Sequence, residues 1–304
     1  MIRRAACLLI VLLGLICGIG ACAEETGEKT DCAGAFAAYE FSMEAFEPVP
    51  VMEYSAGDGS YDLAVSVTGV DESGVSLRLE NKGENSAYFS FSQYILDGLA
   101  VYDYHEWKIP SQTVMEEKIE IREDILRWAG METVGKVTFS TPAFSTEDGP
   151  LLTADTAEAC IGEEAKTAPR PAGMELLSGD WGRLSLIGVD YRDIYSPLVF
   201  RLDNEQPSWT LEWARGVTFY SYLNAEIQTV SVNGEAVEDA ANLSQNWECS
   251  TIGFMYLDSL SGPVDDIDEI RLSIRVTGSG EEGDFDETVE IEVCPDPEQL
   301  VILR

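Results

Sequence analysis

The chain has 304 residues, of which 55 are Asp or Glu and 19 are Lys or Arg, so its formal net charge is −36 and its pI is near 4.1. Nucleic-acid binding needs clustered Lys and Arg against phosphates, so this composition excludes nucleic acid as a partner. The same charge favours solubility and repels the body of the protein from an anionic membrane surface. The length allows two domains of ordinary size.

The N-terminus predicts an export signal. Arg3 and Arg4 precede an uncharged apolar stretch over residues 5–23, the pattern of a secretory signal peptide. The stretch is also about long enough to span a bilayer, so an uncleaved signal anchor is one alternative. A second alternative is ordinary cleavage at the small residues 21–23, which would release a soluble secreted protein.

Cys22 favours a lipoprotein over both alternatives. Ile19, Gly20, Ala21 and Cys22 resemble the bacterial lipobox, whose cysteine receives a diacylglyceryl group before cleavage. Acyl chains, at about 0.8 kcal/mol per buried methylene, would hold the mature protein on the membrane. We therefore expect a signal peptide over residues 1–21 and an extracytoplasmic protein anchored by lipid to the bacterial cell membrane.

A tether is predicted over residues 22–50. Within it, CAGAFAAYEFSMEAF at 32–46 suits a short helix that ends before EPVPV. Further along, REDILRWAG at 122–130 predicts a helix of one or two turns that stops at Gly130.

An internal repeat predicts the architecture. VSVTGVDESGVSLRLEN at 65–81 returns as LSLIGVDYRDIYSPLVFRLDN at 184–204, with GVD in both copies and RLEN or RLDN at the end. Apolar and polar residues alternate in each copy, and this period of two predicts half-buried antiparallel strands. Turn-forming residues separate the paired strands, so each copy is predicted to be a β-hairpin.

The correspondence continues beyond the hairpins. The matching pairs are a turn at 96–98 and 232–234, an Asp-x-Leu segment at 124–126 and 258–260, a penultimate strand at 134–140 and 267–276, and a final strand at 150–160 and 287–294. Between the copies, GEEAKTAPRPAG predicts a semi-rigid linker.

Strands about every eight to twelve residues, with little helix, predict an all-β fold. The chain resembles tandem immunoglobulin-like domains of lipoproteins from Gram-positive gut bacteria of the Firmicutes type. The resemblance rests on the GVD and RLEN hairpin, the DG or NG turn and the Asp-x-Leu segment. The resemblance implies a fold and a location, and no activity. We expect two tandem immunoglobulin-like antiparallel β-sandwich domains after a lipoprotein signal peptide, at 51–161 and 175–304, with a linker at 162–174.

The cysteines of the mature chain allow several disulfide pairings. Besides Cys22 these are Cys32, Cys160, Cys249 and Cys294, which can pair in three ways. An exported location permits disulfides, and four reduced thiols are the alternative. Because Cys160 and Cys294 hold equivalent places in the repeat, we favour Cys249 with Cys294 and Cys32 with Cys160.

Catalysis and metal binding have weak sequence support. A triad using His105, the one histidine, would need a nucleophile elbow, and the sequence has no GxSxG. We therefore expect no enzyme activity, with His105 packed or on the surface. The GEEGDFDET turn offers oxygen ligands that suit Ca²⁺, although an acidic hairpin turn is the preferred interpretation. No cofactor is expected; if calcium binds, Asp284, Asp286 and Glu287 are the candidate ligands.

Aromatic residues suggest a second candidate site. Exposed Tyr and Trp rings stack on sugars or anchor protein partners. Phe89 and Phe91 alternate as the core of a sandwich requires, whereas Tyr220 and Tyr222 lie in the segment that lengthens the second copy. The predicted function is a non-catalytic cell-surface binding or spacer module that meets an unknown surface protein or glycan. The alternative is a carbohydrate-binding accessory lipoprotein that uses Tyr220 and Tyr222.

Overall fold

The computed structural model describes most of the chain from Tyr39 onward. The described residues are 39–101, 104–122, 124–168, 170–192, 197–206, 209–211, 217–219, 222–238, 240–245, 249–257, 260, 267–280 and 283–303. The predicted signal peptide, Cys22, Cys32 and Tyr220 lie outside these residues, so the expectations for them stay predictions.

Both hairpins of the predicted repeat are present. β2 (Asp62–Asp71) pairs antiparallel with β3 (Gly74–Asn81), and β14 (Gly182–Asp190) pairs antiparallel with β15 (Leu198–Asn204). The alternating apolar residues predicted for the core are buried; they are Val75, Leu77 and Leu79 in β3 and Leu198, Phe200 and Leu202 in β15. The predicted hairpins are therefore confirmed in both copies, and the half-buried pattern is confirmed in β3. In β15 the half-buried pattern is wrong, because Val199 and Asp203 on the other face are buried as well.

The repeated GVD sequence shapes the turn that follows each first strand. Oδ1 of Asp71 accepts a hydrogen bond from the backbone N–H of Ser73 at 2.8 Å, and Oδ1 of Asp190 accepts one from Arg192 at 3.0 Å. A side-chain acceptor that binds the N–H two residues later forms an Asx-turn. The aspartate recurs because it stabilises the same turn in both copies.

The asparagine of RLEN and RLDN does the same at the end of each second strand. Oδ1 of Asn81 accepts from Gly83 N–H at 2.9 Å, and Oδ1 of Asn204 accepts from Gln206 N–H at 3.1 Å. The repeated motif is thus structural.

The N-terminal sandwich comprises β1 to β12. One sheet has the order β1-β2-β3-β8, with β1 at Val49–Ser55 and β8 at Thr113–Glu120. The facing strands are β4 (Ala87–Phe91), β5 (Gln93–Leu96), β6 (Leu99–Val101), β7 (His105–Ile109), β9 (Lys136–Ser140), β10 (Ala143–Thr146), β11 (Gly149–Thr153) and β12 (Thr156–Cys160). They form two sheets, with the orders β11-β10-β4-β7 and β12-β9-β5-β6. Strands at the same position in the two orders are consecutive in the chain. They therefore correspond to one four-stranded sheet whose strands are interrupted.

The interruption corrects the single final strand predicted over 150–160. Pro142 has no N–H to donate to a strand ladder, and Thr141 before it has φ 47°, so the pairing breaks here. Opposite the break, the N–H of Thr141 donates to the carbonyl of Asp155 and the N–H of Ala154 donates to that of Pro142. The predicted strand consequently splits into β11 and β12.

The C-terminal half of the chain comprises β13 to β23, of which β16 and β17 form a separate two-stranded sheet and the others form the C-terminal sandwich. Its new strands are β13 (Met174–Gly179), β16 (Trp209–Leu211), β17 (Val217–Phe219), β18 (Tyr222–Val232), β19 (Ala240–Gln245), β20 (Ser250–Met255), β21 (Ile270–Gly280), β22 (Gly283–Val293) and β23 (Val301–Leu303). The order β13-β14-β15-β20 mirrors β1-β2-β3-β8, and β19-β18-β21-β22 mirrors β6-β5-β9-β12. The repeat seen in the sequence is thus a repeat of sheet topology, to which β23 adds a parallel partner for β14.

Buried side chains fill the space between the sheets of each sandwich. In the N-terminal sandwich they include Phe89, Phe91 and Tyr94, which confirms the core prediction for this aromatic cluster. In the C-terminal sandwich, Phe200 from one sheet and Ile274 from the other belong to a second cluster.

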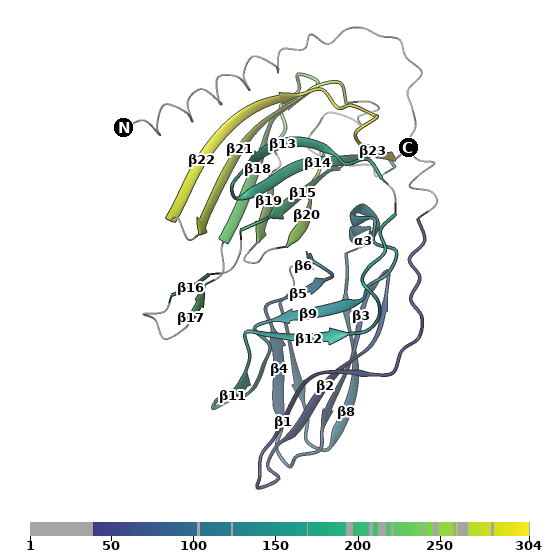
Figure 1. The fold of residues 1–304 in the computed structure, drawn as a ribbon, viewed down its shortest axis with the longest axis vertical. Helices are drawn as coiled ribbons and strands as arrows, with labels where there is room; N and C mark the ends of the chain where they lie inside the picture. Colours follow the sequence, from purple (N-terminus) through teal and green to yellow (C-terminus); the bar gives the residue numbers. More distant parts are fainter. Residues whose placement is uncertain are drawn as a thin grey trace. The chain divides into compact units, whose positions relative to one another are not determined.

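A short parallel pairing joins the two sandwiches (Figure 1). Leu99 and Ala100 of β6 pair with Ser250 and Thr251 of β20, so the sheet β12-β9-β5-β6 continues into β20-β15-β14-β13. The N–H of Ser250 also donates to the carbonyl of Gly98 at 2.8 Å. Described residues of both sandwiches belong to one packed unit.

Helix α3 (Ile125–Ala129) lies at this junction and confirms the helix predicted there, including its stop at Gly130, which has φ 69°. Its Trp128 is 1% exposed. A Cβ on Gly188 of β14 would lie 2.2 Å from Trp128 Cζ3, so the ring occupies the space that this glycine leaves open. The helix therefore links the two cores.

The tether contains no helix over its described part, so the helix predicted at 32–46 is wrong for residues 39–46. Instead Phe41, Met43 and Phe46 pack against the N-terminal core, and the N–H of Ser42 donates to the carbonyl of Glu132 at 2.9 Å. Isolated short helices are marginal, so packing overrides the local propensity. Among the described residues, no helix is both long enough and apolar enough to cross a membrane.

Candidate functional site

A cleft of about 740 Å³ opens on the N-terminal sandwich, within the size range of small-molecule sites. It lies where the β2–β3 turn, the end of β8, the start of α3 and the last part of the tether meet. The side chains that carry its chemistry are Tyr39, Glu72, Lys118, Arg122, Asp124 and Arg127.

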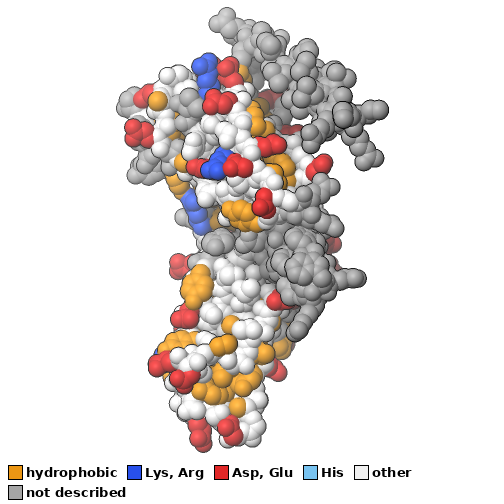
Figure 2. Space-filling view, turned by 90° about the vertical axis from the view of Figure 1, so that its left-hand side faces the viewer, with side chains coloured by type: hydrophobic (Ala, Val, Ile, Leu, Met, Phe, Trp, Pro, Cys, Tyr) orange, Lys and Arg blue, Asp and Glu red, His pale blue; other side chains and the backbone are white. Residues whose placement is uncertain are grey.

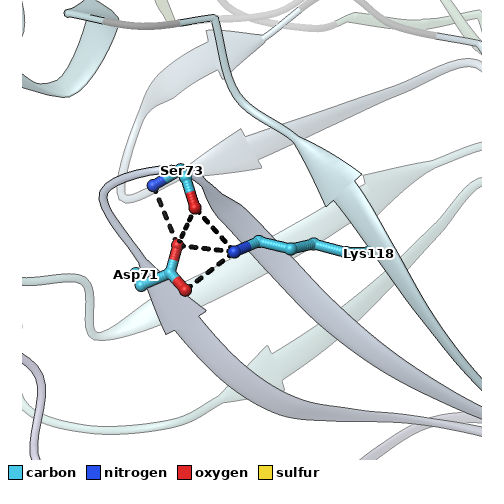
Figure 3. A network of polar contacts seen from close by, with 3 residues as sticks. All are labelled: Asp71, Ser73 and Lys118. Atoms are coloured by element: carbon cyan, nitrogen blue, oxygen red, sulfur yellow. Dashed lines mark hydrogen bonds and ion pairs between the residues drawn. The ribbon is translucent and has the colours of Figure 1, made fainter.

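One wall of the cleft is a polar network built on the repeated aspartate (Figure 3). Lys118 Nζ lies 2.9 and 2.8 Å from the two carboxylate oxygens of Asp71 and 2.6 Å from Ser73 Oγ. Ser73 Oγ also donates to Asp71 Oδ1 at 2.6 Å. Burial raises the pKa of Asp71, but the hydrogen bonds from Lys118 and Ser73 outweigh it and hold that pKa below its usual range. The network fixes the lysine at the cleft margin.

Two arginines rest on aromatic rings around the cleft. The guanidinium of Arg122 lies 4.1 Å from the ring centroid of Phe254 and 5.2 Å from that of Tyr256, and both rings belong to the C-terminal sandwich. Arg127 lies 5.7 Å from the ring centroid of Tyr39. Such cation–π contacts hold a guanidinium plane in a defined orientation. These contacts limit the movement of the two arginine side chains that a ligand would contact.

Tyr39 and Arg127 form a second wall. Burial raises the pKa of Tyr39 to about 12, although the charge of Arg127 acts in the opposite direction. Arg127 Nε also lies 3.5 Å from Asp124 Oδ1. Tyr39 therefore stays a neutral phenol at physiological pH, and its ring supports Arg127 at the cleft wall.

The charge of the cleft differs from that of the chain. Its lining includes three basic side chains and three acidic ones, the latter being Glu72, Glu120 and Asp124, whereas the chain has 19 basic and 55 acidic residues. Figure 2 shows carboxylates scattered over one face of the molecule with few basic side chains among them. With Asp71 of the network included, the cleft is still far less acidic than the chain as a whole, and it suits a polar ligand that both donates and accepts hydrogen bonds.

The carbohydrate-site prediction has one described residue. Tyr222, at the start of β18, is 39% exposed, so its ring is accessible. Tyr220 lies outside the described residues.

The three candidate calcium ligands lie on one hairpin, β21–β22, and do not share one face of it. Asp286 forms a two-pronged ion pair with Arg275, at 3.0 and 2.7 Å. Asp284 and Asp286 share one face of β22, while Glu287 projects from the other because strand residues alternate. The three carboxylates do not converge, and the described part of the chain contains no group of three or more residues that could hold a metal.

The pairing predicted between Cys249 and Cys294 is not formed in this structure. Cys249 is buried beside Ile95 and Ala100 at the junction, where burial raises the pKa of its thiol to about 12. Cys294 is exposed after the end of β22, a strand of the other sheet of that sandwich. Cys160 is exposed, and its predicted partner Cys32 lies outside the described residues.

His105 has a packed position on β7. Its ring stacks on that of Trp107, with centroids 4.9 Å apart and 5° between the planes, and contacts Phe91. It does not belong to the cleft lining.

Sequence reasoning missed the cleft. Its residues come from segments far apart in the chain, and no spacing connects Tyr39 with Lys118 or Arg127. The available signal was the recurrence of basic residues over 118–127 in an acidic chain. No protein-family model matches the chain, and a search of curated proteins finds no significant match.

Proposed function

We propose that this chain is a non-catalytic, lipid-anchored bacterial surface protein, whose two immunoglobulin-like sandwiches form an extracellular binding or spacer module. In this proposal acyl chains on Cys22 hold it on the membrane, and the cleft at Lys118, Arg122 and Arg127 receives the ligand. The observation that carries the proposal is the cleft itself, about 740 Å³ in volume and lined by oriented cations on a chain of net charge −36.

The fold supports presentation of a ligand site. The β6–β20 pairing and Trp128 couple the sandwiches, so surface loops project from one body. Phe41 and Met43 of the predicted tether pack on the core, so the cleft wall at Tyr39 belongs to the same body and would be presented with it.

The experiment has a location arm and a binding arm. Cys22→Ala should move the protein from the membrane fraction to the soluble one, and the intact mass of the wild type should equal residues 22–304 plus the lipid. Purified soluble protein is then screened against arrayed glycans and a library of peptides and small organic acids. Arg122→Gln should weaken the hits about tenfold. The matched control is Arg271→Gln, an exposed arginine paired with Glu269 and Glu292 on the C-terminal sandwich.

Two results would contradict the proposal. An intact mass without the lipid would show that the protein has no lipid anchor. Ligands that bind Arg122→Gln as well as the wild type would show that they do not bind in the cleft.

The exposure of Tyr222 supports a second candidate, a carbohydrate-binding accessory lipoprotein that uses Tyr220 and Tyr222. In that case Tyr222→Ala abolishes glycan binding and Arg122→Gln does not.

A further inference from the structure

Two arginines contact one carboxylate beside the junction, on the outer face of the sheet β14-β15-β20, and a third arginine lies near them. Oδ1 of Asp203 accepts from Arg201 Nε at 2.6 Å and from Ser250 Oγ at 2.5 Å, and Arg183 Nη2 lies 3.4 Å from Oδ2. Arg201 Nη2 also donates to Ser250 Oγ at 2.9 Å. Arg170 of the linker lies close enough for the charges of Arg201 and Asp203 to act on it.

The charges in this arginine cluster do not balance. Arg170, Arg183 and Arg201 carry three positive charges and Asp203 one negative charge, so the cluster is +2 in a chain of net charge −36. Burial, and then repulsion by Arg201, lower the pKa of Arg170 to about 10. Nη1 of Arg170 is shielded from solvent and has no hydrogen-bond partner among the described residues. A buried N–H donor without an acceptor is unfavourable, and Asp203 compensates only part of the positive charge, so an oxyanion would supply both an acceptor and negative charge.

The backbone on both sides of Arg170 is held in place. Ala168 N–H donates to the carbonyl of Gly130 at 2.6 Å, and Gly173 N–H donates to that of Gln299 at 3.0 Å. The side chain lies over Gly130, where an added Cβ would come 3.1 Å from Arg170 Cδ. Because the backbone that carries Arg170 is held in place, the side chain loses less conformational freedom when it binds a ligand.

The remaining arginines leave the cluster open to a ligand. The side chains of Arg183 and Arg201 are 48% and 34% exposed, whereas Asp203 is 10% exposed. Planar guanidinium groups match carboxylate and phosphate oxygens with two parallel hydrogen bonds. The charges and the geometry therefore select for a compact oxyanion.

We propose that Arg170, Arg183 and Arg201 form an oxyanion site that binds the carboxylate or phosphate group of a small ligand, separate from the cleft and independent of the function proposed for it. Inorganic phosphate and acetate are the two probes, each titrated at constant ionic strength against the folded soluble protein. The readouts are the heat of binding and the thermal midpoint, because a ligand that binds only the native state raises that midpoint.

Phosphate, acetate or both should raise the midpoint of the wild type in a saturable way. Arg183→Gln and Arg170→Gln should each weaken binding about tenfold or more. Arg275→Gln, which removes an exposed paired arginine on β21, should bind like the wild type. Arg122→Gln should also bind like the wild type, which separates this site from the cleft. Without a probe anion, Arg170→Gln should be no less stable than the wild type, because it removes a buried positive charge that Asp203 compensates only in part.

A response to phosphate alone assigns a phosphate-bearing ligand, and a response to acetate alone assigns a carboxylate. The proposal is overturned if neither anion binds the wild type, or if Arg275→Gln and Arg183→Gln lose the same affinity, since that loss would be a general charge effect. Circular dichroism checks that each variant folds. If Arg170→Gln does not fold, the half-exposed Arg183→Gln decides.

Discussion

Trp128→Ala should uncouple the two sandwiches. Trp128 is 1% exposed and fills the space above Gly188, within the same cluster as Val199 and Ile252 of the C-terminal sandwich. A buried tryptophan removes about 200 Å² from water, and at about 25 cal/mol per Å² this corresponds to about 5 kcal/mol as an upper bound. Measured costs of truncating buried aromatic residues are about 3–5 kcal/mol, so we expect about 4 kcal/mol here.

Urea unfolding followed by circular dichroism measures the loss, since tryptophan fluorescence would change with the substitution itself. Trp181→Ala is the matched control, because Trp181 is only partly buried against the C-terminal core. It should cost about half as much or less. A free-energy loss for Trp128→Ala no larger than that of the control would refute the reasoning.

Limited proteolysis gives a second readout of the same variant. The linker is held by hydrogen bonds from Glu132 N–H to the carbonyl of Lys166 at 2.8 Å and from Ala168 N–H to that of Gly130 at 2.6 Å. Loosening α3 should release these bonds and expose residues 162–168 to protease under native conditions. Equal cleavage rates for wild type and Trp128→Ala would mean that the helix does not couple the sandwiches.

The remaining predictions concern charges and thiols. Burial raises the pKa of Asp203, but its arginine and serine partners outweigh this and lower it, so its stabilisation is present above pH about 4 and is lost as the pH falls through the folded pKa. Asp203→Asn should therefore cost on the order of 2–3 kcal/mol at neutral pH and flatten the loss of stability towards acid in thermal melts; an unchanged acid profile would contradict this. Lys118→Met should cost only about 0.5 kcal/mol in urea unfolding, because Asp71 is 57% exposed and water screens the pair, and a loss of several kcal/mol would contradict the screening. In native protein, alkylation followed by mass spectrometry should label exposed Cys160 well before buried Cys249; a Cys160 that reacts only after reduction would support its predicted disulfide.

Residues close together in the sequence predicted the hairpins, the end of the helix and a tight turn. Alternation over 65–81 and 184–204 predicted the hairpins, and Gly130 predicted the helix end, because each depends on neighbours in sequence. The DG turn was also readable: Asp97 and Gly98 both have positive φ, as a tight hairpin turn requires. The helix proposed at 32–46 was wrong over its described part because its apolar side chains pack on a core that the segment itself does not indicate.

Long-range pairing could not be predicted in this way. β6 has three residues, and it pairs with β20 about 150 positions later through Leu99 with Ser250 and Ala100 with Thr251. A three-residue strand has too short a pattern to distinguish from a turn. The preferred pairing of Cys249 with Cys294 could not be judged from the sequence for the same reason. Equivalent places in a repeat say which cysteines are alike, and they do not say that Cys249 packs beside Ile95 and Ala100 of the N-terminal sandwich.

The parallel pairing of β6 with β20 determines what surrounds the cleft and the arginine cluster. One edge strand of the N-terminal sandwich becomes a neighbour of β20, so the outer face of the sheet β14-β15-β20 is turned towards α3 and the linker. Along this face, Ile252 packs at the middle, Phe254 lies under Arg122 at one end, and Ser250 contacts Arg201 at the other. Strand alternation places these three β20 side chains on the same side. The cleft lining comes from the N-terminal half of the chain, with Phe254 and Tyr256 supporting Arg122 from the other sandwich. The arginine cluster comes from the C-terminal sandwich, with Arg170 added by the linker. Repeated motifs supply only part of each site, so the sequence alone could not indicate the rest.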